Sequence, residues 1–350
     1  MVTGRFEGIP VVLDAMGGDH APAAPVEGAV LAAREFGMPI YLVGQEEAVR
    51  AELARHDHKG LPLTLVPASE TIGMDEQPSL AVRRKKDSSM VVGMRLVKEG
   101  KARAFVSMGN TGAVMAAALF HLGRIKGVKR PALATIFPTM QGFCLLLDIG
   151  ANADCKPEYL LQFGMMGSLY ARRVLGVESP RVGIVSNGEE EGKGNQLVKD
   201  AYKLLKASPL HFVGNVEGKD IPAHLADVVV TDGFTGNVII KTAEGMAKMM
   251  KTFIKEELYR SPISMLGGLL AKGAFDRISK RTDYSEFGGA VLLGVDGVVI
   301  IGHGRSNGWA VRSALRVAAQ AVASGVLEDI RQDIAAQMGA EEEAEEALEL

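Results

Sequence analysis

Short apolar runs alternate with longer amphipathic segments along most of the chain. The runs are rich in Val, Ile and Leu and lack polar alternation, which is typical of strands buried on both faces of a parallel sheet. Six such runs span residues 10–14, 39–44, 104–107, 143–148, 181–186 and 227–231. All but one end near a Gly, Asn or Asp cluster that leads into a helical pattern. The pattern predicts an α/β fold with a doubly wound, mostly parallel sheet, whose ligands bind in loops after the strands.

One segment departs from this alternation. Residues 234–280 form a long helical pattern, interrupted at Ser261 and Pro262 and again at the pair Gly267 and Gly268. The interruption predicts a helical hairpin, at about residues 240–285, that projects from the sheet. Strand character returns over 288–301, around an Asp-Gly turn, and a helix follows over 307–322. We expect one α/β domain over 1–335 and an acidic tail over 336–350, as solvated helix or disorder.

Composition restricts the classes of partner. The net charge is −3, with 39 basic and 42 acidic residues, and only 5% of residues are aromatic. Proteins that bind nucleic acid normally carry a basic excess and often stacking aromatic residues. We therefore expect no nucleic-acid partner.

The cysteines and the N-terminal sequence indicate the compartment. Cys144 and Cys155 have neither CxxC spacing nor a nearby His, so they predict no zinc site and no disulfide. We interpret both as small apolar residues in a reducing compartment. The N-terminal sequence lacks the pattern of a secretory signal, and no apolar run approaches the roughly 20 residues that span a bilayer. We expect a cytoplasmic protein.

The first polar loop, DAMGGDHAP, joins a strand to a helix. Its candidate ligand residues are Asp14, Gly17, Gly18, Asp19 and His20. Glycines allow backbone N–H groups to approach an anion at a helix N-terminus. The adjacent glycines do not match GxGxxG, so a nicotinamide cofactor is not indicated, and we expect no cofactor. A tight turn capped by Asp19 explains the loop equally well.

The second and third loops have the same strand-to-helix setting. SMGNTGA offers Asn110, Thr111 and Gly112, either as helix caps or as anion ligands. DIGANADCKPEY offers Asn152 and Asp154 after Asp148. This acidic loop could bind Mg²⁺, but Asx-rich turns are far commoner than metal sites, and we expect no metal.

The fourth loop, SNGEEEGKGN, is the most informative. It resembles a phosphate loop with a lysine, and its candidate residues are Asn187, Gly192 and Lys193. Walker A requires four residues between its glycines and a Ser or Thr after the Lys, and this loop has neither. Nucleoside triphosphate binding is therefore not supported. A glycine-flanked Lys at a helix start can hold inorganic phosphate, although a solvated charged loop is the plainer interpretation.

Two further loops add polar groups. TDGFTGN contributes Asp232, Gly233, Thr235, Gly236 and Asn237 at the start of the long helix, where an amide can stabilise an oxyanion or the residues can simply cap the helix. GHGRSN contributes His303, suited to proton transfer, and Arg305, suited to phosphate. We expect all six loops at one end of one sheet.

Together these loops resemble the PlsX family of phosphate acyltransferases. The shared motifs are DAMGGDHAP, SMGNTGA, DIGANADCKPEYLLQFG, SNGEEEGKGN, TDGFTGN and GGAxLLGVDGVVIIGHGRS, in the same order from about residue 11 to about residue 322. The resemblance implies a fold akin to phosphotransacetylases and isopropylmalate dehydrogenases, and a homodimer. It also implies conversion of acyl-carrier protein and inorganic phosphate to acyl phosphate, the first committed step toward bacterial phospholipids.

The resemblance also implies roles for individual residues. A thioester is already activated, so phosphate can attack it without a protein nucleophile. Lys193 is expected to hold and orient phosphate, and Asn237 to polarise the thioester carbonyl. His303 and Arg305 are second candidates on the phosphate or thiolate side.

The hairpin mixes apolar residues with a basic rim, as interfacial helices do. The family's members are peripheral membrane proteins, which favours contact of Ile263, Leu266, Leu269 and Leu270 with an anionic membrane surface. Dimer packing explains the same pattern.

Other functions remain open from the sequence. A phosphotransacetylase-like enzyme that uses coenzyme A thioesters shares this chemistry, and a non-catalytic phosphate-binding protein shares the loops. Acyl chain preference and the carrier-protein surface are not specified, although the basic residues at 83–86 could meet an acidic partner.

Overall fold

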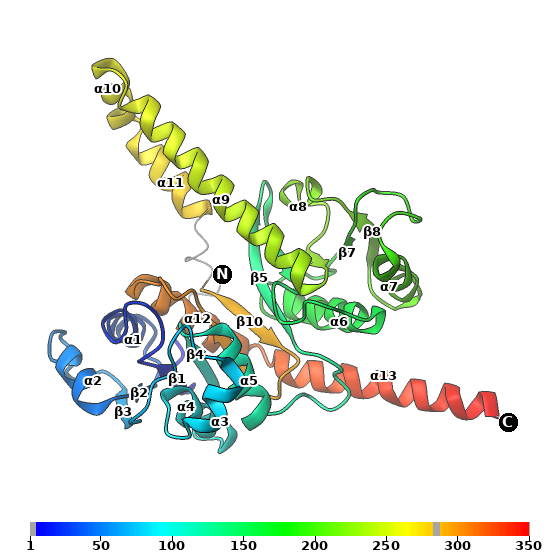
Figure 1. Cartoon of the computed structure of the whole chain (residues 1–350), viewed down its shortest axis with the longest axis horizontal. Coiled ribbons are helices and arrows are strands. Elements are labelled where there is room, and N and C mark those ends of the chain that lie inside the picture. The colour runs from blue at the N-terminus through cyan, green and yellow to red at the C-terminus, as the bar shows by residue number, and fades with distance from the viewer. Residues whose placement is uncertain (1–4, 283–287, 350) are drawn as a thin grey trace.

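The computed structural model describes residues 5–282 and 288–349, and its strands form one eleven-stranded sheet (Figure 1). The strand order is β3-β2-β1-β4-β11-β10-β5-β6-β9-β7-β8. Seven strand pairings are parallel and three are antiparallel. The predicted α/β fold with a mostly parallel sheet is therefore confirmed.

The first half of the sheet contains five mutually parallel strands. They are β1 (Val11–Asp14), β2 (Ile40–Gly44), β3 (Leu63–Pro67), β4 (Ala104–Ser107) and β11 (Val298–Ile301). The helices of this half are α1 (Ala23–Phe36), α2 (Glu46–Leu53), α3 (Pro78–Arg84), α4 (Ser89–Lys98), α5 (Thr111–His121) and α12 (Gly308–Ala323). Side chains on a strand alternate between faces. Val11 and Leu13 accordingly pack in one core with residues of α1 and α12, and Val12 packs in another with residues of α4 and α5.

The second half contains four mutually parallel strands. They are β6 (Gly142–Leu147), β9 (Val228–Val230), β7 (Val182–Val185) and β8 (Phe212–Val216). The helices of this half are α6 (Pro157–Arg173), α7 (Gln196–Ala207) and α8 (Asp220–Ala223).

Two antiparallel strands, β10 and β5, reverse the sheet's direction between its halves. β10 (Ala290–Leu293) pairs antiparallel with β11 and with β5 (Ala132–Thr139), and β5 pairs antiparallel with β6. Three reversals leave the strands of the second half running opposite to those of the first. The six polar loops therefore divide into two sets of three, and the expectation that all lie at one end of one sheet is wrong. Apolar runs reveal that a segment is a strand but not which way its neighbour runs.

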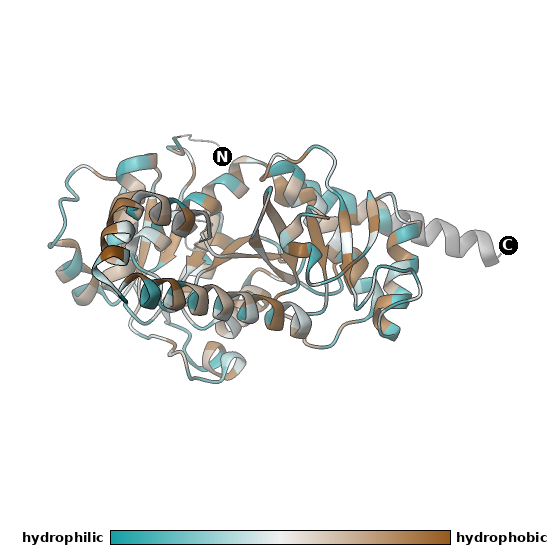
Figure 2. Cartoon of the chain, turned by 90° about the horizontal axis from the view of Figure 1, so that it is seen from above, coloured by the Kyte–Doolittle hydropathy of each residue, from teal (hydrophilic) through white to brown (hydrophobic). Residues whose placement is uncertain are grey.

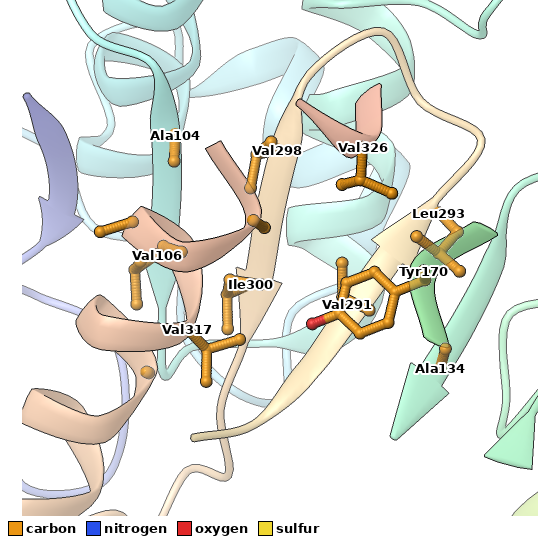
Figure 3. Close-up of a cluster of buried hydrophobic side chains, with 14 of the residues drawn as sticks. Ala104, Val106, Ala134, Tyr170, Val291, Leu293, Val298, Ile300, Val317 and Val326 are labelled. Carbon is orange, nitrogen blue, oxygen red and sulfur yellow. The ribbon is translucent and has the colours of Figure 1, made fainter. Parts of the chain in front are cut away.

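The junction between the halves is packed with apolar side chains. Tyr170 of α6 lies beside Val291 and Leu293 of β10, with Val326 nearby (Figure 3). Figure 2 shows the same distribution across the molecule, with apolar strands in the interior. Burial raises the pKa of the Tyr170 hydroxyl. The two halves thus share one continuous core.

The predicted hairpin consists of three helices that project from the body (Figure 1). They are α9 (Gly233–Leu258), α10 (Pro262–Leu270) and α11 (Lys272–Thr282). The predicted break at Ser261 and Pro262 is confirmed, since Ser261 Oγ caps α10 by accepting from Ser264 N at 3.1 Å. The predicted break at Gly267 and Gly268 is wrong, because both lie inside α10, where Gly268 packs against Leu258. The end of the expected hairpin, 283–285, lies outside the described residues.

The chain ends in α13 (Val326–Glu349), which extends from the opposite side of the body (Figure 1). An ion pair between Arg331 and Asp296, 2.7 Å long, ties its first turns to the β10–β11 turn. The acidic tail thus continues this helix.

Candidate functional site

The first loop is built over a buried carboxylate. Asp14, fully buried at the end of β1, accepts a hydrogen bond from Ser107 Oγ at 2.7 Å and from Met16 N at 3.1 Å. Burial raises the pKa of Asp14, and hydrogen bonds from Ser89 and Ser107 oppose that effect. A Cβ on Gly17 would lie 2.7 Å from Asp14 Oδ2, so only glycine fits above this pair. Asp14 therefore holds the loop in shape from beneath it.

The first, second and sixth loops meet through their backbones. Asp19 N donates to Gly304 O at 2.7 Å, and Gly302 N donates to Ser107 O at 2.9 Å. Gly18 has a φ of 97°, a left-handed conformation that favours glycine, and its Cα packs against the same Gly304 carbonyl. Loops from β1, β4 and β11 thus form one surface, from which the side chains of Asp19 and His20 are exposed.

Asn110 acts as a helix cap within this surface. Its Oδ1 accepts from Ala113 N at 3.1 Å, and its Nδ2 donates to Met74 O at 2.9 Å. The neighbouring Gly112 packs against Pro78 at the start of α3, whereas Thr111 is exposed. Asn110 therefore fixes the second loop to the segment before α3, and its side chain is already satisfied.

The sixth loop faces the long helix α9. Arg305 Nη2 lies 3.8 Å from Glu244 Oε2, and Glu244 is paired with Lys241 at 3.2 Å. Burial lowers the pKa of His303, and the nearby charges of Arg305 and Lys241 lower it further. The lowered pKa favours the neutral form of the His303 imidazole. The sixth loop therefore lies next to α9, the helix that begins in the fifth loop.

A second buried carboxylate organises the third loop. Asp148 accepts hydrogen bonds from the backbone N–H groups of Leu133, Gly150, Ala151 and Asn152 at 2.7–3.1 Å. Its pKa is raised by burial, against the effect of these donors. The Asn152 side chain donates to Asp148 Oδ2 at 2.9 Å and to Pro131 O at 2.7 Å. The Asn152 side chain therefore stabilises the third loop, whereas Asp154 is exposed.

The fifth loop places the N-terminus of α9 directly on the third. A Cβ on Gly236 would lie 1.9 Å from Asp148 O, and one on Gly233 would lie 2.7 Å from Asn152 O. Asp232 caps α9 by accepting from Thr235 N at 2.8 Å and from Thr235 Oγ1 at 2.7 Å. Both glycines are thus required by packing, and both Asp232 and Thr235 have structural partners.

Asn237, in the first turns of α9, differs from these residues. Its side chain is exposed, and within the described part of the chain its amide has no hydrogen-bond partner. The packing of Gly233 and Gly236 against the third loop fixes the backbone position of Asn237. Asn237 therefore presents an unoccupied amide at a helix N-terminus.

Lys193 stands at the end of the fourth loop. Its backbone N–H donates to Glu190 O at 3.0 Å, and its aliphatic stem packs over Gly188. Asn187 Oδ1 accepts from Gly194 N at 2.8 Å, which closes the loop around the lysine, while Gly192 is exposed. Among the residues described, no carboxylate pairs with the exposed Lys193 ammonium. The loop therefore presents an unpaired cation.

Two of the three glutamates of this loop pair with lysines elsewhere, and Glu190 forms no ion pair within the described residues. Glu191 pairs with Lys206 at 2.8 Å, and Glu189 lies 3.4 Å from Lys219. Glu189 also forms an acidic group with Glu217 and Asp220, whose ligand atoms lie within 4.8 Å of one another. Lys219 Nζ also lies 2.5 Å from Glu217, so a lysine already supplies cationic charge there. Within the described residues, none of the three glutamates pairs with the Lys193 ammonium.

The topology places Lys193 and Asn237 on neighbouring loops. β9 pairs with β6 on one side and with β7 on the other, and neighbouring strands lie about 4.8 Å apart. The fifth loop, after β9, therefore lies between the third and fourth. Helices α7 and α9 both begin here, capped by Asn195 and Asp232, so two positive helix ends face the same region. This arrangement can bind an anion and polarise a carbonyl.

Some residues of the site escaped the sequence prediction. Ser107 supports Asp14, Glu244 reaches Arg305, and the buried Ser186 Oγ lacks a hydrogen-bond partner in the described residues. Ser107 and Ser186 lie in the motifs, where a hydroxyl at a strand end is a usable signal. Glu244 lies in mid-helix, and only the fold brings it to the sixth loop.

The four hairpin residues expected to contact a membrane lie in α10. All are exposed, from 59% for Leu266 to 85% for Ile263. None of the helices searched in the described residues has the length and apolar character of a membrane span.

Three comparisons identify relatives of this chain. Residues 9–329 match the model of the family described as fatty acid synthesis protein. The chain is 55% identical over 307 residues to the phosphate acyltransferase of Heliobacterium modesticaldum, covering 87% of this chain and 92% of that protein. It is 53% identical over 306 residues to the phosphate acyltransferase of Geotalea daltonii, covering 87% and 88%.

Among solved structures, the EutD phosphotransacetylase from Staphylococcus aureus superposes with a TM-score of 0.57. The sequences are 16% identical, and the match covers 91% of this chain and 95% of that one. At this identity the likeness establishes the fold alone, which agrees with the expected relation to phosphotransacetylases. The family match and the sequence identities go further: this chain is an acyltransferase and belongs to the fatty acid synthesis protein family, the PlsX phosphate acyltransferases that its loops resemble.

Proposed function

We propose that the enzyme converts acyl-carrier protein and inorganic phosphate to acyl phosphate and free carrier protein, for phospholipid biosynthesis. The observation that carries the proposal is that Lys193 and Asn237 lie on neighbouring loops, are exposed, and have no side-chain partner among the described residues. A cation and an amide donor on adjacent loops suit a reaction between an anionic nucleophile and a carbonyl.

In the proposed reaction, Lys193 and the N-terminus of α7 hold phosphate. One phosphate oxygen attacks the thioester carbon, and the new C–O bond forms as negative charge collects on the carbonyl oxygen. The Asn237 amide donates a hydrogen bond to that oxygen, a kind of contact that accelerates acyl transfer by about 10²–10³-fold when it is preorganised. When the intermediate collapses, the C–S bond breaks and the carrier leaves as a thiolate.

The first set of loops has a supporting role in this proposal. Burial lowers the pKa of His303 and favours the neutral imidazole, so in this proposal His303 hydrogen-bonds phosphate and does not remove its proton. Arg305 adds positive charge on the same surface. The ligand roles expected for the other loop residues remain predictions. Five of these residues also have hydrogen-bond partners within the fold: Asp14, Asn110, Asn152, Asp232 and Thr235.

The hairpin supports a further part of the proposal, peripheral association with an anionic membrane surface. Ile263, Leu266, Leu269 and Leu270 are exposed on α10, at the tip of the projection (Figure 1). Basic side chains such as Lys272 and Arg277 accompany them on α11. We place the protein in the cytoplasm as a homodimer, with membrane contact and dimer packing as the two candidate uses of this surface.

The proposed reaction is tested with purified enzyme, phosphate and a long-chain acyl group on either carrier protein or coenzyme A. Acyl phosphate formed from the carrier-protein thioester supports the proposal. Product from coenzyme A alone would make the enzyme phosphotransacetylase-like, and phosphate binding without product from either donor would favour a binding protein.

A further inference from the structure

A groove lies among α3, α4 and α5, away from the loops described above. It encloses about 410 Å³ and is lined by Val82, Arg83, Lys86, Val91, Arg95, Phe120 and His121. Val82 and Val91 are buried and form an apolar base, while the Phe120 side chain is 47% exposed. The groove therefore combines an apolar interior with a rim of basic side chains.

The rim cations form no close ion pair within the described residues, although the charge of Arg95 lowers the pKa of the Asp87 and Glu99 carboxyls. Arg83, Lys86 and Arg95 form no ion pair with any residue that the structure describes. The Arg83 guanidinium lies 5.0 Å from the Phe120 ring centroid, and Arg95 donates to the Lys86 carbonyl at 3.3 Å. Lys85, by contrast, is bound to Glu76 at 2.6 Å. Three positive charges thus face solvent around one exposed aromatic ring.

The nearest acidic groups are engaged elsewhere. Asp87 Oδ2 accepts from Ser69 Oγ at 2.6 Å, and Glu99 pairs with Lys101 at 2.7 Å. Burial and the charge of Arg95 lower the pKa of His121, so it adds no charge at pH 7. The groove is therefore cationic through its arginines and lysine, and it suits a partner that offers carboxylates.

The groove is connected to the loops of the candidate site. α5 begins at Thr111 in the second loop and ends at His121, so Phe120 lies about 15 Å along the helix from that loop. α3 begins where Pro78 packs against Gly112, and Asn110 ties the preceding segment to the same loop. A protein bound in the groove would rest on the two helices that start at the loops.

We propose that this groove docks the acidic carrier protein that delivers the acyl thioester. A carrier helix would set carboxylates against Arg83, Lys86 and Arg95 and an apolar side chain against Phe120, leaving the thioester to reach the loops on a flexible arm. Charge complementarity of this kind mainly raises the association rate and selects the partner. The inference rests on the proposed use of a carrier-protein thioester.

The test compares the double variant Arg83→Glu/Lys86→Glu with a control of equal charge change, Lys59→Glu/Arg103→Glu, whose side chains are exposed outside the groove. Each is assayed for acyl phosphate formation with the acyl-carrier protein and with the same acyl group on pantetheine. We expect kcat/KM for the carrier protein to fall roughly tenfold or more in the groove variant, and less at high salt. The pantetheine reaction and the control should match wild type.

Several results would overturn the inference. Equal loss with both donors would place the effect at the active site, and unchanged kcat/KM with the carrier protein would leave the groove without this role. Weaker binding of the groove variant to anionic phospholipid vesicles, with normal carrier-protein kinetics, would assign the groove to lipid. If wild type makes acyl phosphate from neither donor, the proposed function fails instead. If the double glutamate variant does not fold, Arg83→Gln/Lys86→Gln must show the same selective loss.

Discussion

Most polar side chains around the candidate site are committed to holding its loops. Asp14 and Asp148 are buried beneath the loops, and Asp232 and Asn110 cap helices. Within the described residues, the Lys193 ammonium and the Asn237 amide are exposed without such partners. Because these polar groups do not hold their own loops, substitutions at the two positions are expected to affect activity more than stability.

Lys193→Ala should lower turnover by about 10²–10³-fold and weaken phosphate saturation, because the loop loses the cation that faces the anion. Thermal unfolding should change little, since the ammonium has no partner among the residues that the structure describes. Lys199→Ala, on an exposed position of α7, serves as the control and should behave as wild type. Wild-type phosphate kinetics in the Lys193 variant would remove its proposed role.

The cysteines give a second prediction at this scale. Burial, together with the charge of Asp148, raises the pKa of Cys155, in the third loop, to about 12. A raised pKa keeps the thiol protonated, and only the thiolate is a nucleophile. Cys155→Ala should therefore retain activity, and iodoacetamide should not inactivate the wild type at pH 7. Loss of activity with a trapped acyl-cysteine would contradict direct attack by phosphate.

At the scale of elements, the position of α9 decides where Asn237 lies. Gly236 has no room for a side chain against the Asp148 carbonyl, whereas Gly245, further along the same helix, has open space around it. Gly236→Ala should destabilise the protein by about 1–3 kcal/mol through steric overlap and reduce activity as well. Gly245→Ala should instead stabilise it by about 0.5–1 kcal/mol. Urea unfolding of both variants measures the difference, and equal stabilities would contradict the described packing.

The exposed apolar residues of α10 carry the membrane prediction. Burying one leucine contributes about 1.5–3 kcal/mol, so Leu269→Glu/Leu270→Glu should reduce binding to anionic vesicles by at least tenfold. Val213→Glu/Leu225→Glu also replaces two exposed apolar side chains with carboxylates, in the second half of the sheet, and should bind normally. Flotation measures binding. Undiminished flotation with a shift from dimer to monomer would assign α10 to the dimer interface.

The strands were predictable in proportion to their burial. β1, β4 and β9 are fully buried and read as unbroken apolar runs. The prediction missed β3 and β8, which are half-exposed edge strands, and β5, which contains Pro138 and pairs antiparallel on both sides. An edge or antiparallel strand needs no continuous apolar run, so its pattern resembles that of a loop.

At the scale of the whole molecule, the reversal of the sheet divides the six motif loops between two halves. Each motif was visible in the sequence because glycines and caps recur at strand ends. The grouping of the loops in space could not be predicted from the sequence. It depends on the antiparallel strands β5 and β10, and on α9, whose Glu244 lies near Arg305. The motifs were sufficient to indicate the family. Only the fold distinguishes the side chains that stabilise the loops from those available to contact a substrate.

The most direct test of the proposed reaction is the dependence of thiol release on phosphate. Free carrier-protein thiol and acyl phosphate should appear in equal amounts from an acyl-carrier protein, and neither should form without phosphate. Thiol released in the absence of phosphate, with free fatty acid as the product, would show that water is the acceptor and would contradict the account.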